Sequence, residues 1–259
     1  MTETLLNLSD VSLSYDGTPV VEHVNLQIVP GEILCIVGES GSGKTSLLRG
    51  ICDAGEVQVD GGEISFHNDQ IPCCTSNDRR KALGCGIGII MQNPSGTFNP
   101  LRRFDVQIRE MMQSHGMSYQ KEDVIGLFEQ MGLTNGEEIL TSRPYEMSGG
   151  MNQRIAIAST MLLEPKLLLC DEPTSALDVT SAGLVVELLC RYRKKYNVGI
   201  LMVTHNLGIA YQMADTIGIM RSGRMVEYGA AREIFHHPKE EYTKQLLHDV
   251  PKLAGYRNE

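Results

Sequence analysis

The sequence predicts an α/β fold with an N-terminal antiparallel β subdomain, a core of buried strands and an inserted α-helical subdomain. Apolar and polar residues alternate over residues 11–15 and 24–28, as they do in strands with one buried face. Residues 32–37 form an almost continuous apolar run, which is typical of a strand buried on both faces. Between residues 104 and 131 apolar side chains recur at helical spacing instead.

The other elements follow from turn signals and apolar runs. Asp16-Gly17 predicts a hairpin between the first two strands, and a helix is expected over residues 44–52 after a glycine-rich loop. Buried strands are expected at 167–171 and 199–203, with a helical stretch between them. A hairpin over residues 217–226 then closes the core.

Length and composition fit one domain over residues 1–259, with the helical subdomain at about 95–163 and a C-terminal tail at about 230–259. Hydrophobic residues make up 42% of the chain, enough for a full core. The formal net charge of −9, without a run of Lys and Arg, argues against a nucleic-acid partner. The polar N-terminus and the odd count of 7 cysteines favour a cytosolic protein with reduced thiols. No apolar run approaches the ~20 residues of a membrane-spanning helix, so other chains would have to cross any membrane at which the protein works.

The segment Gly38-Glu-Ser-Gly-Ser-Gly-Lys44-Thr45 fits the P-loop pattern GxxxxGK[ST] and lies between a predicted buried strand and a predicted helix. Small residues there let backbone N–H groups surround phosphate oxygens, and the helix N-terminus favours their negative charge. Lys44 can reach the β- and γ-phosphates, Thr45 can bind Mg²⁺ and Ser46 can add a phosphate contact. A chance glycine-rich turn would not bring strand, loop and helix into register. The predicted phosphate-binding residues are Gly38, Glu39, Ser40, Gly41, Ser42, Gly43, Lys44, Thr45 and Ser46.

Two acidic residues, Asp171 and Glu172, follow the apolar run 167–170. They should emerge at the carboxyl end of a buried strand, which we expect to lie next to the P-loop strand. Asp171 can hold Mg²⁺, and Glu172 can act as general base on the attacking water. Without the P-loop, an acidic turn after a core strand would be the better interpretation.

Three further features are weak alone and gain weight from their order. Ser148-Gly149-Gly150 precedes an apolar helical stretch and predicts a second anion-binding helix start. Gln92 follows the apolar run 87–90, and His205 ends another apolar strand. A lone Gln in a loop is usually solvated and a lone His is usually structural. Here they fall in the order P-loop, Gln, Ser-Gly-Gly, Asp-Glu, Ser175-Ala-Leu-Asp178, His.

This order resembles the ABC ATPases over nearly the whole chain. The resemblance implies a RecA-like P-loop core that uses ATP and Mg²⁺. The family motifs would then be Walker A at 38–45, the Q-loop at Gln92, the signature at 148–150, Walker B at 168–171 with Glu172, the D-loop at 175–178 and the switch His205. It also implies that Thr45, Gln92 and Asp171 serve the metal and that Glu172, Gln92 and His205 are catalytic. Tyr15 lies where the family has an aromatic that stacks on adenine. Met147 and Met151 replace the outer Leu and Gln of the usual signature, while its Ser and both Gly remain.

Within that family the chain is most similar to ATP-binding subunits of peptide and nickel importers. The resemblance rests on residues 91–94, 98–101, 145–151 and 237–247. Many peptide-importer subunits continue with a Cys-rich extension, whereas this sequence has no cysteine after Cys190. That difference and the Met-Ser-Gly-Gly-Met signature resemble the nickel-importer subunit more than the dipeptide one, and the resemblance implies uptake of nickel or of peptides or metal chelates. The alternative function is an ABC component of a phosphonate-degrading (carbon–phosphorus lyase) complex. A DNA-repair ATPase would have a coiled-coil insertion or a basic face, and a degenerate regulatory subunit would lack Glu172 or His205.

The resemblance also implies partners and a location. ATP would bind between the P-loop of one subunit and residues 148–150 of a second, related ATPase subunit. Two integral membrane permeases and, indirectly, a substrate-binding protein would complete the transporter at the cytoplasmic face of the inner membrane. A permease helix would dock on apolar residues of the segment 98–131. Cys73, Cys74 and Cys85 do not match a zinc pattern, and we interpret them as free thiols.

Overall fold

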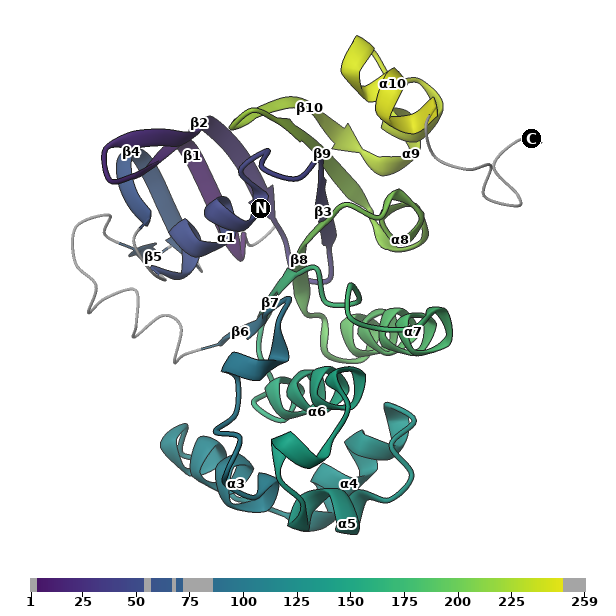
Figure 1. Ribbon diagram of the computed structural model, residues 1–259. Coiled ribbons are helices and arrows are strands. Elements are labelled where there is room, and N and C mark those ends of the chain that lie inside the picture. The colour runs from purple at the N-terminus through teal and green to yellow at the C-terminus, as the bar shows by residue number, and fades with distance from the viewer. Residues whose placement is uncertain (1–3, 54–56, 67–68, 72–85, 249–259) are drawn as a thin grey trace. The chain divides into compact units, whose positions relative to one another are not determined.

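The computed structural model describes residues 4–53, 57–66, 69–71 and 86–248 and forms two compact units (Figure 1). The first unit comprises Met1–Leu83 and Gly199–Glu259, and the second comprises Gly84–Val198. Cys73, Cys74 and Cys85, which the sequence suggests are free thiols, lie outside the described residues. Among the helices in the described ranges, none has the length and apolar character that crossing a bilayer requires.

An antiparallel sheet opens the first unit, as the alternating sequence predicts. Its strand order is β2-β1-β4-β5. The turn between β1 and β2 has positive φ at both Asp16 (46°) and Gly17 (75°), which matches the predicted hairpin. The strands are β1 (Leu6–Tyr15), β2 (Thr18–Ile28), β4 (Val57–Phe66) and β5 (Asp69–Ile71).

A second group of strands in the same unit carries the P-loop. All five residues of β3 (Ile33–Val37) are buried, and β3 pairs in parallel with β8 (Gly199–Thr204) on one side and β9 (Thr216–Arg221) on the other. Both edges of β3 are therefore occupied, and the prediction that the strand ending in Asp171 lies next to the P-loop strand is wrong. β8, which comes later in the chain, takes that place. The unit is completed by β10 (Arg224–Ala230), antiparallel to β9, and by α1 (Lys44–Cys52), α8 (Leu207–Met213), α9 (Ala231–His236) and α10 (Glu241–His248).

The second unit contains a parallel strand pair and the helical insertion (Figure 1). Phe104, Ile108, Val124, Phe128 and Met131 are all fully buried, which confirms the helical spacing of these apolar residues. The limits of the predicted helical subdomain, about 95–163, stay a prediction. The elements are β6 (Ile87–Ile90), β7 (Leu167–Asp171), α3 (Phe104–Ser114), α4 (Lys121–Gln130), α5 (Gly136–Thr141), α6 (Gly149–Met161) and α7 (Val179–Tyr196), with short 3₁₀ turns η1 (Pro94–Gly96) and η2 (Pro144–Glu146).

Candidate functional site

The glycine-rich loop joins β3 to α1 in the first unit and requires glycine at defined positions. A Cβ atom on Gly38 would lie 2.1 Å from the carbonyl oxygen of Met220, much closer than atoms can approach. Gly43 has φ 102° and directly precedes the first residue of α1. Larger residues would push the loop away from β9 or distort the helix start, so the sequence pattern has a steric basis here.

Lys44 is held inside this loop and is only 6% exposed. Its Nζ donates to the carbonyl oxygens of Gly38 (2.8 Å) and Glu39 (2.7 Å) and to Ser42 Oγ (3.3 Å). The three N–H donors of an ammonium group thus have three acceptors from the loop. Thr45 and Ser46 follow in the first turn of α1, which carries no acidic residue. A positive side chain and a helix N-terminus at one loop suit a phosphate group.

Tyr15 and His205 also belong to the first unit. Tyr15 ends β1 and is half-buried, and its hydroxyl accepts a hydrogen bond of 3.1 Å from Arg49. His205 directly follows β8 and is exposed. The next residue, Asn206, caps α8 by accepting from the amides of Gly208 and Ile209. The roles of Tyr15 at adenine and of His205 at phosphate remain predictions.

In the second unit the structure brings two predicted catalytic residues into contact. Asp171 is the last residue of β7 and is 4% exposed. Glu172 follows it with a positive φ of 45°. The side-chain amide of Gln92, in the loop after β6, donates to Glu172 Oε2 at 3.1 Å. Residues from the ends of two parallel strands therefore meet at one edge of the pair, as the topology dictates.

Gln153, which the sequence motifs do not indicate, connects the same two loops. Gln153 lies in α6 and is 1% exposed. Its amide nitrogen donates to the carbonyl oxygens of Met91 (3.0 Å) and Pro173 (3.2 Å), the residues just before Gln92 and just after Glu172. The only signal in the sequence is an amide side chain among the apolar residues of the predicted helix. Gln153 fixes the backbone on both sides of the Gln92–Glu172 pair.

The Ser-Gly-Gly segment begins α6, as predicted. Ser148 is the N-cap, and its Oγ accepts from the amide of Met151 at 3.3 Å. Ser148 and Gly149 are exposed, so this helix start is accessible from solvent. Asp178 similarly caps α7 by accepting from the amide of Ser181 at 3.0 Å. Two helix N-termini in this unit thus carry the signature and the D-loop.

The predicted site residues therefore fall into two groups, one in each unit. The first unit holds Tyr15, the P-loop residues 38–46 and His205, while the second holds Gln92, residues 148–150, Asp171 and Glu172. The predicted metal-binding groups are a hydroxyl, an amide and a carboxylate, all oxygen donors of the kind that Mg²⁺ prefers. Within the part of the chain that the structure describes, no cluster of three or more His, Cys, Asp or Glu could hold a metal by itself. This donor set fits an ion bound together with phosphate oxygens.

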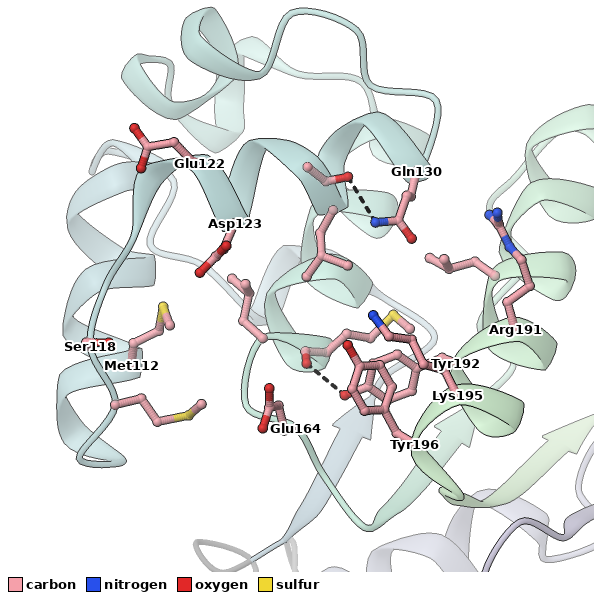
Figure 2. Close-up of a pocket in the computed structure, with 16 residues that line it drawn as sticks. Met112, Ser118, Glu122, Asp123, Gln130, Glu164, Arg191, Tyr192, Lys195 and Tyr196 are labelled. Atoms are coloured by element: carbon pink, nitrogen blue, oxygen red, sulfur yellow. Dashed lines mark hydrogen bonds between the residues drawn. The ribbon is translucent and has the colours of Figure 1, made fainter.

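A separate groove of about 800 Å³ lies in the second unit (Figure 2). Asp123 from α4 and Glu164 border it on one side, and Arg191 and Lys195 from α7 border it on the other (Figure 2). The Tyr192 hydroxyl in this groove donates to the carbonyl oxygen of Met161 at 2.9 Å. Burial, and then the charge of Glu164, raise the pKa of Tyr192, so it stays a donor. No predicted site residue lines this groove, which is distinct from the residues expected to bind nucleotide.

Comparison with known proteins connects these features to one family. The family model described as "ABC transporter" matches residues 21–175. The chain is 34% identical to the oligopeptide transport ATP-binding protein OppD of Lactococcus lactis subsp. cremoris, over 96% of this chain and 76% of that protein. It is 35% identical to the dipeptide transport ATP-binding protein DppD of Haemophilus influenzae, over 96% and 78% respectively. A solved structure of an ATP-binding subunit of an ABC transporter matches with TM-score 0.77 and 25% identity over 95% of each chain.

Proposed function

Because this chain belongs to the ABC transporter family as an ATP-hydrolysing subunit, we propose that it powers the uptake of peptides into the cell. The contact between Gln92 and Glu172 carries the catalytic part of the proposal, since it gives a candidate general base a fixed partner. Peptide cargo is favoured by the similarity to OppD and DppD. Nickel, which the signature variant favours, is the second candidate. The similarity to OppD and DppD does not specifically support a phosphonate-degrading complex.

In the proposed mechanism the P-loop binds the phosphates of ATP. Lys44 would donate to phosphate oxygens in place of the carbonyl oxygens of the loop. The backbone amides at the start of α1 supply further donors. Thr45, Asp171 and Gln92 would hold Mg²⁺, which neutralises part of the triphosphate charge when bound. Tyr15 would stack on adenine.

Glu172 then acts on the attacking water. A carboxylate near the γ-phosphate can accept a proton from that water as its oxygen attacks phosphorus, and the bond to the leaving ADP oxygen breaks. The amide of Gln92 orients this carboxylate through the 3.1 Å hydrogen bond. His205 would contact the γ-phosphate and stabilise the charge that develops there.

The exposed start of α6 supports a composite site. Ser148 and Gly149 present a capped helix N-terminus to solvent, a suitable anion-binding surface for a nucleotide held by another subunit. We propose a head-to-tail pair with a second, related ATPase subunit, which forms two such sites and leaves no free end. Two permeases and, indirectly, a substrate-binding protein complete the transporter. The chain would then be peripheral, at the cytoplasmic face of the inner membrane.

Reconstitution and uptake test this proposal together. The ATPase rate of the purified chain should be low, should depend on protein concentration, and should rise when the second subunit and the permeases are added. Full activity of the isolated chain without concentration dependence would contradict the composite site.

In cells that lack the chain, uptake of a labelled dipeptide should be lost while uptake of radioactive nickel is kept. The opposite result would assign the nickel function instead.

A further inference from the structure

The C-terminal part of the first unit contacts the P-loop directly, and we propose that Tyr242 on α10 is a positioning residue for nucleotide binding. This inference rests on the proposed ATP-binding function of the loop and adds a residue about two hundred positions away in sequence. Tyr242 anchors the backbone at Glu39, the second residue of the loop. It acts through that backbone and does not itself contact the nucleotide.

Both backbone groups of Glu39 have partners. Its N–H donates to the Tyr242 hydroxyl at 3.4 Å, and its carbonyl oxygen accepts from Lys44 Nζ at 2.7 Å. The hydroxyl and the ammonium group thus restrain the two sides of the same residue. Since the position of Lys44 depends on the Glu39 carbonyl, a shift at Glu39 changes the group expected to meet the phosphates.

Tyr242 is itself held in place, which is what an anchor requires. Its side chain is 8% exposed, and the guanidinium of Arg221 stacks on its ring at 4.6 Å from the centroid. The start of α10 is fixed by Glu227, whose carboxylate accepts from the amides of Lys239 (2.9 Å) and Glu240 (3.3 Å). The ring therefore cannot follow the loop if the loop moves.

The turn between β9 and β10 makes a second contact with the same loop. The amide of Gly223 donates to the carbonyl oxygen of Ser42 at 3.0 Å. Gly223 has φ 80°, and a Cβ atom there would lie 2.8 Å from the Val20 carbonyl oxygen, so this turn is closely fitted. Arg221, which holds the Tyr242 ring, comes two residues earlier. One hairpin thus supports the loop at Ser42 and, through Tyr242, at Glu39.

Replacing Tyr242 by Phe removes the hydroxyl and keeps the buried ring. The Glu39 amide then loses its acceptor, and the loop samples more conformations before nucleotide binds. A single long hydrogen bond is weak, so we expect ATP affinity to fall by about 3- to 5-fold. The rate of the chemical step should hardly change, because neither Glu172 nor Gln92 is touched.

Tyr228→Phe is the matched control. Tyr228 lies on β10 of the same unit, and its hydroxyl also makes a 3.4 Å hydrogen bond, to the carbonyl oxygen of Gln27 in β2. Both variants thus lose one hydroxyl hydrogen bond of equal length to the backbone, but only Tyr242→Phe affects the P-loop. Arg221→Gln, which removes the stacked cation, should weaken ATP affinity in the same direction as Tyr242→Phe.

The test combines ATP titration with kinetics of the assembled transporter and amide hydrogen exchange of the full chain. For Tyr242→Phe we expect Kd and KM for ATP to rise 3- to 5-fold, kcat to stay near wild type, and the Glu39 amide to exchange faster. Tyr228→Phe should leave all three unchanged. Wild-type affinity and Glu39 protection in Tyr242→Phe, equal losses in both variants, or a fall in kcat with unchanged KM would each overturn the inference. If the wild-type chain itself did not bind ATP, the proposed function would fail instead.

Discussion

The side-chain amide of Gln92 donates a 3.1 Å hydrogen bond to a carboxylate oxygen of Glu172, so the loop after β6 is joined to the turn after β7. Gln153 donates to the backbone of both segments, at Met91 and Pro173. A movement of the Gln92 loop therefore moves the partner of the candidate base. This arrangement gives a physical route by which the helical insertion can affect hydrolysis.

Glu172→Gln should retain ATP binding and nearly abolish turnover. The substitution keeps the shape of the side chain and removes its basicity, so a loss of ~10²-fold or more in ATPase rate is expected. Steady-state hydrolysis by the assembled transporter and ATP titration measure the two effects separately. Glu129→Gln, at an exposed position of α4, is the control and should keep both. Hydrolysis near the wild-type rate in Glu172→Gln would exclude Glu172 as the base.

Gln153→Leu should reduce both stability and activity. The substitution leaves the carbonyl oxygens of Met91 and Pro173 without their buried donor, which costs about 1–3 kcal/mol of unfolding free energy. Urea denaturation measures this loss, and the ATPase rate should fall because the Gln92–Glu172 contact loosens. Gln130→Leu is the control, because the exposed Gln130 amide donates to the carbonyl oxygen of Gly126 in its own helix. Equal stability of both variants would show that the Gln153 contacts contribute little.

Lys44→Ala should weaken nucleotide binding itself. Lys44 is the buried cation of the P-loop, and a charge-assisted hydrogen bond to phosphate is worth roughly 1.5–3 kcal/mol, or about 10- to 100-fold in affinity. Titration with a fluorescent ATP analogue measures the change. Lys194→Ala, at an exposed position of α7, alters net charge equally and should bind as wild type. If both variants lost the same affinity, general electrostatics rather than the loop would explain the binding.

Asp178→Ala should destabilise α7 in a pH-dependent way. Hydrogen bonds from the backbone and then the side chain of Ser181 lower the pKa of Asp178 in the folded protein. A lowered pKa means that the contribution is fully present above the unfolded value of about 3.9 and is lost as pH falls through the folded value. At pH 7 the variant should melt about 2–4 °C below wild type, as for loss of an N-cap. Thermal unfolding at pH 7 and below pH 3 checks this, and a pH-independent difference would contradict it.

Leu101 should contact a permease in the assembled transporter. It is 73% exposed, and Val106 on α3 is 36% exposed, so apolar side chains of the segment 98–131 do reach the surface. A photo-reactive amino acid placed at 101 or 106 should cross-link to a permease, because exposed apolar groups commonly mark interaction sites. The same group at residue 63 in β4 is the control. Cross-links from residue 63 alone would place the permease contact on the antiparallel sheet.

Patterns of apolar and polar residues in the sequence predict most of the fold. Residues 24–28, 33–37 and 167–171 lie in strands, and residues 44–52 form the helix after the P-loop, because burial and local turn chemistry decide these elements. β4 was not predicted, since Gly61-Gly62 resembles a turn within it. Gly62 instead has φ 81° where the backbone of Asp10 approaches, at a shift in the β1–β4 register.

The sequence predicts which residues form the candidate site, and their roles stay predictions, but it does not predict the contacts between them. The P-loop pattern at 38–45 indicates phosphate chemistry by itself, and residues 92 and 171–172 become candidates only together with it. No local sequence pattern predicts the hydrogen bond from Gln92 to Glu172, 80 positions away, because that contact depends on how two strands align. The same reason explains the incorrect neighbour predicted for the P-loop strand. Strand order is a tertiary property, and β8 is specified by a segment far along the chain.

At Glu172, a substitution that raises thermostability is expected to remove ATPase activity. Its φ of 45° is a left-handed conformation that costs a residue with a Cβ atom roughly 1 kcal/mol or more, and glycine adopts it without strain. Glu172→Gly would therefore relieve strain while removing the proposed base. Selection for heat resistance alone should enrich variants that have lost ATPase activity at this position. A stabilised form of this protein should be sought by changes elsewhere, with Glu172 held fixed.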